Sequence, residues 1–122
     1  MPKRILVVED DGMLLEGIRD ILEATGYEVR TAHSGLGGLQ ALLGGFDPHV
    51  IVSDVTMPKI NGYELLQTVR IHPAWAAIPF IMLTGRGTHL EAPPPEANGV
   101  HAFIPKPFGA DALVDAIEAA LQ

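Results

Sequence analysis

HVIVSD, residues 49–54, is an apolar run that ends in two polar residues, and the same pattern recurs along the chain. Its length and its branched side chains are typical of a buried strand. Four further runs have strand length and are bounded by turn residues: RILVV (4–8), YEVRTA (27–32), FIMLT (80–84) and AFIPK (102–106). The sequence therefore predicts five short strands.

Between these runs, apolar residues recur at the 3.6-residue spacing of an amphipathic helix, most clearly over 14–22 and 113–121. Gly26 is a typical stop for the first helix, and Asn61 with Glu64 three residues later forms a capping-box pattern. Strand and helix thus alternate. This alternation predicts a doubly wound α/β fold, in which a parallel sheet carries helices on both faces.

The composition of the strands predicts their order in the sheet. The first, third and fourth runs are almost wholly apolar, as expected of strands buried on both faces. The second run contains Glu28 and Arg30, and the fifth contains Pro105, so these two are expected at the edges. The order 2-1-3-4-5 of flavodoxin-like folds satisfies this pattern and places a ligand-binding switch point between strands one and three.

The overall composition limits the function classes. With 122 residues, the chain is expected to form one domain over residues 1–122. It has no cysteine, which excludes disulfides and thiolate chemistry. The net charge of −7 disfavours direct binding to nucleic acid. Because no apolar run is long enough to span a bilayer and the N-terminus does not resemble a signal peptide, we expect no membrane insertion and a cytoplasmic location.

Residues with charged or hydroxyl side chains lie at the carboxyl ends of the predicted strands, at one edge of the sheet: Glu9, Asp10, Asp54, Thr84 and Lys106. Carboxylates gathered at the switch point must take up protons or recruit a cation, and Mg²⁺ prefers such oxygen ligands. A lysine and a threonine facing a metal-bound carboxylate suit phosphoryl transfer, which needs charge neutralisation and positioning. Asp54 would then be the nucleophile and form an aspartyl phosphate.

The motifs ILVVEDD, VSDVTMP, NG, LTG and KPF, in this order, resemble the receiver domain of bacterial two-component response regulators. The resemblance covers essentially the whole chain. It implies that Glu9 and Asp10 hold magnesium, Asp10 directly and Glu9 through water. It also implies that Asp54 is the phosphoacceptor and that the backbone carbonyl of Thr56 is a further metal ligand.

The same resemblance implies that Thr84 and Lys106 contact the phosphoryl group and that Phe103 is an aromatic switch residue. In this family the bond between Lys106 and Pro107 is often cis. The implied function is a signalling switch that is phosphorylated by a sensor histidine kinase or a histidine phosphotransfer protein, with intrinsic autophosphorylation and hydrolysis. Whether the chain is a stand-alone regulator or a receiver from a longer protein stays open.

Three consecutive prolines, Pro93–Pro95, interrupt the region where the family usually has a helix between the fourth and fifth strands. Proline within a helix costs about 3 kcal/mol and forces the preceding residue toward extended conformations. We therefore expect the helix across residues 88–98 to be broken or shortened. A rigid loop is favoured over a polyproline partner-binding segment.

Two other functions fit the fold class. A pseudo-receiver would keep the fold and signal without phosphate, although the intact acidic set, Asp54, Thr84 and Lys106 argue against it. A flavodoxin-like redox carrier is disfavoured because the first loop is acidic and lacks the residues that bind a flavin phosphate. The five histidines show no metal-binding spacing and are interpreted as incidental.

Overall fold

The computed structural model describes residues 2–85 and 99–122 of the chain. These ranges contain five strands, as the sequence predicts, and four helices, and strand and helix alternate as far as β4. The strands are β1 (Arg4–Val8), β2 (Glu28–Ala32), β3 (Val50–Asp54), β4 (Phe80–Thr84) and β5 (Val100–Pro105). The helices are α1 (Gly12–Thr25), α2 (Gly35–Leu43), α3 (Gly62–Ile71) and α4 (Ala110–Ala120).

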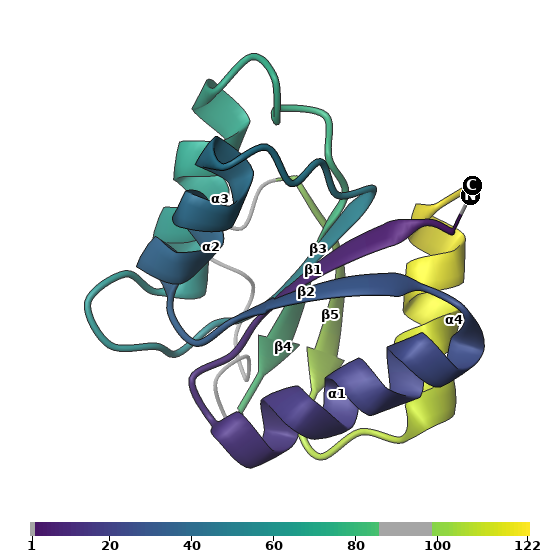
Figure 1. Cartoon of the computed structure of the whole chain (residues 1–122). Coiled ribbons are helices and arrows are strands. Elements are labelled where there is room, and N and C mark those ends of the chain that lie inside the picture. The colour runs from purple at the N-terminus through teal and green to yellow at the C-terminus, as the bar shows by residue number, and fades with distance from the viewer. Residues whose placement is uncertain (1, 86–98) are drawn as a thin grey trace.

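All strand pairs are parallel, and the order β2-β1-β3-β4-β5 confirms the predicted flavodoxin-like topology (Figure 1). Val8 is paired with Ser53, and Asp54 with Leu83. The carboxyl ends of the central strands therefore lie at the same edge of the sheet, where ligands bind in such folds.

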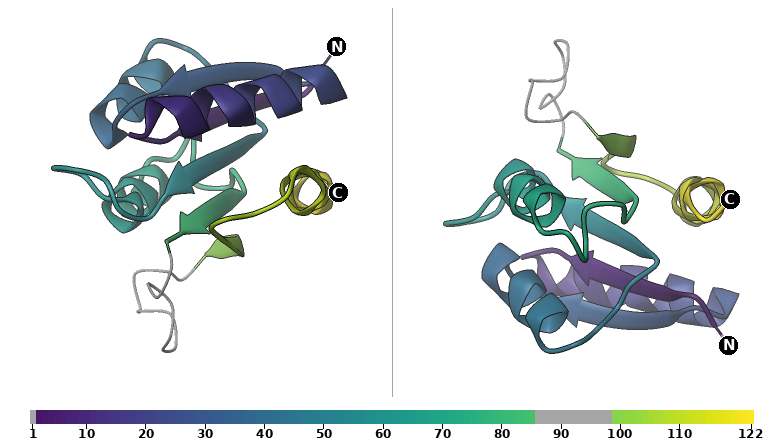
Figure 2. Two further views of the ribbon diagram at one scale, coloured as in Figure 1. Left: turned by 90° about the horizontal axis from the view of Figure 1, so that it is seen from below. Right: turned by 90° about the horizontal axis from the view of Figure 1, so that it is seen from above.

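Helices cover both faces of the sheet, with α1 and α4 on one face and α2 and α3 on the other (Figure 2). Alternate residues of β1 contribute to the two cores: Ile5 and Val7 pack on the α1 and α4 side, whereas Leu6 and Val8 pack on the α2 and α3 side. All four are fully buried. This double burial explains why the central strands are continuously apolar.

Local capping interactions fix where the helices begin and end. Asp11 caps α1 through its side chain, which accepts hydrogen bonds from the amides of the first turn. Asn61 and Glu64 form the predicted capping box at the start of α3, with both hydrogen bonds at 2.9 Å. Gly26 ends α1 in the left-handed conformation, with φ of 106°. The starts of α1 and α3 are thereby held next to the acidic edge.

Arg70 connects the last turn of α3 to two other segments. Its guanidinium group donates to the carbonyl of Ala76 at 3.2 Å and to the carbonyl of Gly99 at 3.0 Å. Burial lowers the pKa of this guanidinium group, which nevertheless keeps its charge. The end of α3 is thus joined to the loop before β4 and to the residue that precedes β5.

The predicted break in the helix across residues 88–98 lies outside the described residues. Within the described part of the chain, no helix combines the length and the apolar character needed to cross a membrane.

Candidate functional site

Three carboxylates meet where β1 and β3 end. Glu9 and Asp10 follow β1 directly, and Asp54 is the last residue of β3. Glu9 and Asp54 are buried, with 0% and 4% of their surfaces exposed, whereas Asp10 is exposed. One oxygen atom from each carboxylate lies within 4.8 Å of the others. A set of three oxygen donors at this spacing can hold a single hard cation.

The ammonium group of Lys106 lies between two of these carboxylates. Its Nζ donates to Oε1 of Glu9 at 2.9 Å and lies 3.1 Å from Oδ2 of Asp54. The amide of Lys106 donates to the carbonyl of Thr84 at 2.7 Å, which attaches the backbone of this residue to the end of β4. The bond between Lys106 and Pro107 is cis, as is common in the family that the sequence resembles.

Burial dominates the electrostatics of Glu9. Burial, together with the charge of Asp54, raises the pKa of the Glu9 carboxyl group from 4.5 to about 7. Hydrogen bonds from Lys106 and from the amide of Asp11 act in the opposite direction. A single ammonium group, shared with Asp54, therefore does not fully compensate the loss of hydration at Glu9.

The pKa of Lys106 is set by two opposing effects. Burial lowers the pKa of its ammonium group, but the hydrogen bonds and negative charges of Glu9 and Asp54 outweigh that effect and raise it overall. Lys106 is therefore fully charged at neutral pH. With Asp10 nearby, carboxylates still outnumber the ammonium group, which leaves negative charge for a second cation to neutralise.

Magnesium fits the chemistry of this donor set. Mg²⁺ is a hard cation that binds carboxylate oxygens and keeps several of its waters, so it does not require a closed protein cage. The exposed position of Asp10 leaves one side of the cluster open to solvent, while Glu9 and Asp54 supply buried oxygens. Among the described residues, Glu9, Asp10 and Asp54 are the group of side chains that could hold the ion.

Thr84 brings a buried hydroxyl group to the same edge. Among the residues that the structure describes, its Oγ1 is the only buried side-chain oxygen or nitrogen without a hydrogen-bond partner. A buried polar group left without a partner costs about 1–3 kcal/mol, and most such groups in proteins are bonded. The Thr84 hydroxyl is therefore available to a ligand that enters the site.

Thr56 and Phe103 lie in elements that adjoin the site. Thr56 is exposed in the loop that follows Asp54, which connects β3 to α3. Phe103 is half-buried on β5, where it is paired with Met82 and packs against the core beneath α2 and α3. The roles of both residues remain predictions.

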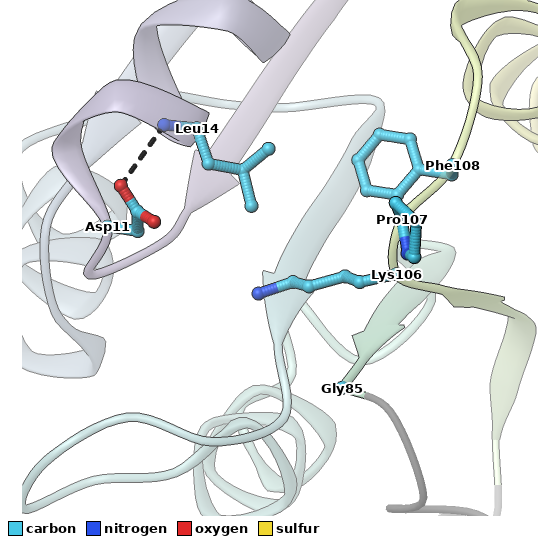
Figure 3. Close-up of a pocket in the computed structure, with 6 residues that line it drawn as sticks. All are labelled: Asp11, Leu14, Gly85, Lys106, Pro107 and Phe108. Atoms are coloured by element: carbon cyan, nitrogen blue, oxygen red, sulfur yellow. Dashed lines mark hydrogen bonds between the residues drawn. The ribbon is translucent and has the colours of Figure 1, made fainter.

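An open groove of about 550 Å³ runs beside the carboxylate cluster. It is lined by the start of α1 and by the loops after β4 and β5, through Asp11, Leu14, Gly85, Lys106, Pro107 and Phe108. Figure 3 shows Leu14 and Phe108 on opposite walls, with the ammonium end of Lys106 reaching toward the α1 side. Leu14 belongs to the helical pattern over 14–22 and Phe108 to the KPF motif, but neither pattern predicts this groove.

The chain matches the response regulator receiver domain family over residues 5–118. It is 35% identical over 119 residues to the transcriptional regulatory protein CpxR homolog of Haemophilus influenzae. This alignment covers 98% of this chain and 50% of that protein. It is 34% identical over 122 residues to the response regulator MprA of Mycobacterium sp. strain KMS. This alignment covers 100% of this chain and 52% of that protein. The chain thus spans about half the length of these curated relatives.

Solved structures share the fold over nearly the whole chain. A response regulator receiver domain protein from Clostridium thermocellum has a TM-score of 0.86 and 32% identity, covering 98% of this chain and 94% of that one. The chemotaxis response regulator CheY4 of Vibrio cholerae has a TM-score of 0.83 and 28% identity, covering 99% and 100%. The chain therefore belongs to the response regulator receiver domain family of two-component systems.

Proposed function

We propose that this chain is a phosphorylation-dependent switch, in which Asp54 accepts a phosphoryl group from a phosphohistidine. The donor would be a sensor histidine kinase or a histidine phosphotransfer protein. The observation that carries the proposal is the position of the Lys106 ammonium group, 2.9 Å from Glu9 and 3.1 Å from Asp54. A fixed positive charge beside a buried carboxylate can neutralise the oxygens of an incoming phosphoryl group.

In the proposed transfer, a carboxylate oxygen of Asp54 forms a bond to phosphorus while the bond from phosphorus to the histidine nitrogen breaks. The nitrogen takes the electron pair, and an acyl phosphate forms on Asp54. Lys106 pairs with one phosphoryl oxygen, and the buried Thr84 hydroxyl donates to another. Attack of water on phosphorus later releases phosphate and restores the carboxylate, so the switch resets itself.

We propose Mg²⁺ as the cofactor, held by Glu9, Asp10, Asp54 and the backbone carbonyl of Thr56. When bound, it would neutralise negative charge on the phosphoryl oxygens, which lowers the barrier to phosphoryl transfer. The carboxylate oxygens within 4.8 Å of one another support this assignment. Lys106, which follows the edge strand β5, compensates part of the same negative charge.

Thr84 and Phe103 are proposed to carry the signal away from the site. The Thr84 hydroxyl would turn toward the phosphoryl group, which changes the space available beside β4. Phe103 lies on the neighbouring strand β5 and is only half-buried, so its ring can occupy a more buried position without breaking a full set of core contacts. The surface around β5 would then differ between the two states.

Acetyl phosphate provides a direct test, because it donates a phosphoryl group without a kinase. The protein is incubated with acetyl phosphate, with and without Mg²⁺, and its intact mass is measured. We expect the mass of one phosphoryl group to be added only with Mg²⁺, and the addition to be absent in Asp54→Asn. Asp115→Asn, which changes an exposed carboxylate of α4, should behave as the wild type.

Two results would contradict the proposal. No adduct on the wild type under any condition would favour the pseudo-receiver, which keeps the fold and signals without phosphate. An adduct that persists in Asp54→Asn would place the phosphoacceptor elsewhere.

A further inference from the structure

We propose that Gly35, the first residue of α2, is a positioning residue for the magnesium site and acts through Ile60. The inference rests on the proposed function, in which the loop between β3 and α3 presents the carbonyl of Thr56 to the metal. Neither Gly35 nor Ile60 is among the site residues predicted from the sequence. Their contact lies on the α2 side of that loop.

The loop over residues 55–61 is fixed at both of its ends. The amide of Val55 donates to the carbonyl of Leu83 at 2.9 Å, and the amide of Gly62 donates to the carbonyl of Val55 at 2.8 Å. Gly62 packs so closely that a Cβ atom there would overlap the carbonyl oxygen of Asp54. Because hydrogen bonds hold both ends, the path of the loop between them depends on the contacts of its interior residues.

Met57 and Ile60 both connect the interior of this loop to the core, and Ile60 is the one that lies against Gly35. The side chain of Ile60 is half-buried and packs against the hydrophobic cluster beneath α2 and α3. Its amide donates to the carbonyl of Pro58 at 2.8 Å, across Lys59, which has a positive φ of 69°. This tight turn restricts the backbone of Ile60, so we expect a displacement there to spread to the neighbouring loop residues.

Gly35 approaches Ile60 too closely to carry a side chain. A Cβ atom at position 35 would lie 2.7 Å from Cγ2, 2.8 Å from Cβ and 3.0 Å from the carbonyl oxygen of Ile60. Rotation about the side-chain bonds of Ile60 cannot move its Cβ or its carbonyl oxygen. Any side chain at position 35 therefore requires a backbone shift, either at the start of α2 or at Ile60 in the metal-binding loop, and the proposal is that the loop shifts.

The helix itself would accept alanine at position 35. Gly35 does not have the positive φ that favours glycine, and alanine stabilises helices more than glycine does. The side chain of Ser34 caps α2 by accepting from the amide of Gly37 at 3.0 Å, and this bond does not involve a side chain at position 35. The predicted consequence of Gly35→Ala is therefore an intact α2 with a displaced loop.

The test is a titration with Mg²⁺ alone, followed through the backbone amide resonances of the full chain. We expect Gly35→Ala to bind Mg²⁺ about tenfold more weakly than the wild type, a loss typical of residues that orient metal ligands. The amide resonances of residues 55–57 and 59–61 should already be shifted before Mg²⁺ is added. Gly17→Ala is the matched control, because a Cβ atom at this helical glycine meets no atom within 4 Å.

A second variant tests whether Ile60 transmits the effect. Ile60→Gly removes the two side-chain atoms that a Cβ atom at position 35 would overlap and leaves only the carbonyl oxygen, at 3.0 Å, so adding Gly35→Ala to Ile60→Gly should cost less affinity than adding it to the wild type. A residue that only stabilises α2 would show the same loss whichever residue occupies position 60. The double-variant comparison thus separates positioning from general stability.

The outcomes are distinct. Wild-type affinity in a folded Gly35→Ala variant overturns the proposal, and so does a tenfold loss that persists in the Ile60→Gly background. If Gly35→Ala does not fold, we expect the double variant to fold again, and failure to do so also overturns it. Absence of Mg²⁺ binding in the wild type would instead refute the proposed function, and this inference with it, before any variant is compared.

Discussion

The ammonium group of Lys106 donates to Oε1 of Glu9 at 2.9 Å, although the two residues are 97 positions apart in the sequence. The contact joins the end of β1 to the end of β5, which are not neighbours in the sheet. Lys106 therefore supplies positive charge to buried carboxylates at the place where a divalent cation is proposed to bind. Protein stability and metal binding should depend on each other at this site.

Lys106→Met should lower the free energy of unfolding by about 2 kcal/mol in the absence of Mg²⁺, because Glu9 and Asp54 lose their compensating charge. The effect stays below that of a fully buried pair, since 24% of the Lys106 side chain is exposed and Glu9 can take up a proton. Added Mg²⁺ should restore part of the loss. Urea unfolding with and without Mg²⁺ measures both effects.

Lys3→Met is the control for this comparison, because Lys3 is exposed, and it should change stability by less than about 0.5 kcal/mol. A Lys106→Met variant that is as stable as the wild type without Mg²⁺ would contradict the prediction.

The raised pKa of Glu9 predicts that its contribution to stability falls as pH rises. Its carboxyl group titrates at 4.5 in the unfolded chain and at about 7 in the folded protein. Between these values the folded state holds a proton that the unfolded state has lost, so the stabilisation is complete below 4.5 and is lost as pH rises through about 7. In the absence of Mg²⁺, the wild type should lose stability relative to Glu9→Gln between about pH 5 and about pH 8.

Urea unfolding of both proteins at the two pH values measures this difference, and the glutamine variant serves as the control because it cannot titrate. If the gap in stability between the two proteins is the same at both pH values, Glu9 does not have the raised pKa.

Thr84→Val should leave the unphosphorylated protein as stable as the wild type, or up to about 1 kcal/mol more stable. The hydroxyl is buried without a partner, and a methyl group of similar size removes that cost. The variant should nevertheless lose the phosphorylation-dependent change around Phe103, because the donor to the phosphoryl group is gone. Thermal unfolding and amide spectra after treatment with acetyl phosphate test the two parts.

Thr68→Val offers a contrast, since the Thr68 hydroxyl donates to the carbonyl of Glu64 at 3.0 Å. A loss of stability in Thr84→Val that exceeds the loss in Thr68→Val would show that the Thr84 hydroxyl already has a partner in the unphosphorylated state.

His49 should make the protein less stable in mildly acidic solution. Its Nδ1 accepts from the amide of Arg4 at 2.9 Å, and protonation would remove this acceptor. Burial, together with the charges of Arg4 and Lys3, lowers the pKa of His49 below 6.5. A lowered histidine pKa means that the stabilisation is complete above about 6.5 and is lost as pH falls below that value.

His49→Asn provides an amide oxygen as acceptor without a titrating group. The stability of the wild type relative to this variant should decrease between about pH 7 and about pH 5, which thermal unfolding can follow. His33→Asn changes an exposed histidine and should not alter the pH dependence. A constant difference between the wild type and His49→Asn would contradict the prediction.

The sheet order could be predicted because the edge strands differ chemically from the central ones. Glu28 and Arg30 point to solvent on β2, and Pro105 ends β5, whereas the three central strands are buried throughout or nearly so. The acidic cluster followed from the same order. Parallel strands end at one edge, so topology alone brings Glu9 close to Asp54.

The direction of individual side chains, and the way a helix packs against a loop, could not be predicted from the sequence pattern. Glu9 and Asp10 are adjacent in the sequence, yet one is buried and the other exposed, because the two side chains leave the strand end in different directions. The spacing of the histidines indicates no role for His49, yet its Nδ1 accepts a hydrogen bond from the amide of Arg4. The contact between Gly35 and Ile60 depends on how α2 packs against the loop over 55–61, and no local sequence pattern predicts that packing.

Arg70 gives β5 a second point of attachment. The strand ends next to Lys106, which contacts Asp54, and it begins after Gly99, whose carbonyl accepts from Arg70 at 3.0 Å. Arg70 belongs to α3, the helix that follows the Asp54 loop. One end of β5 is therefore linked to Asp54 itself, through Lys106, and the other end is linked to the helix that follows the Asp54 loop, through Arg70. We expect the strand to respond to a change at Asp54 by moving as a unit, rather than by fraying from one end.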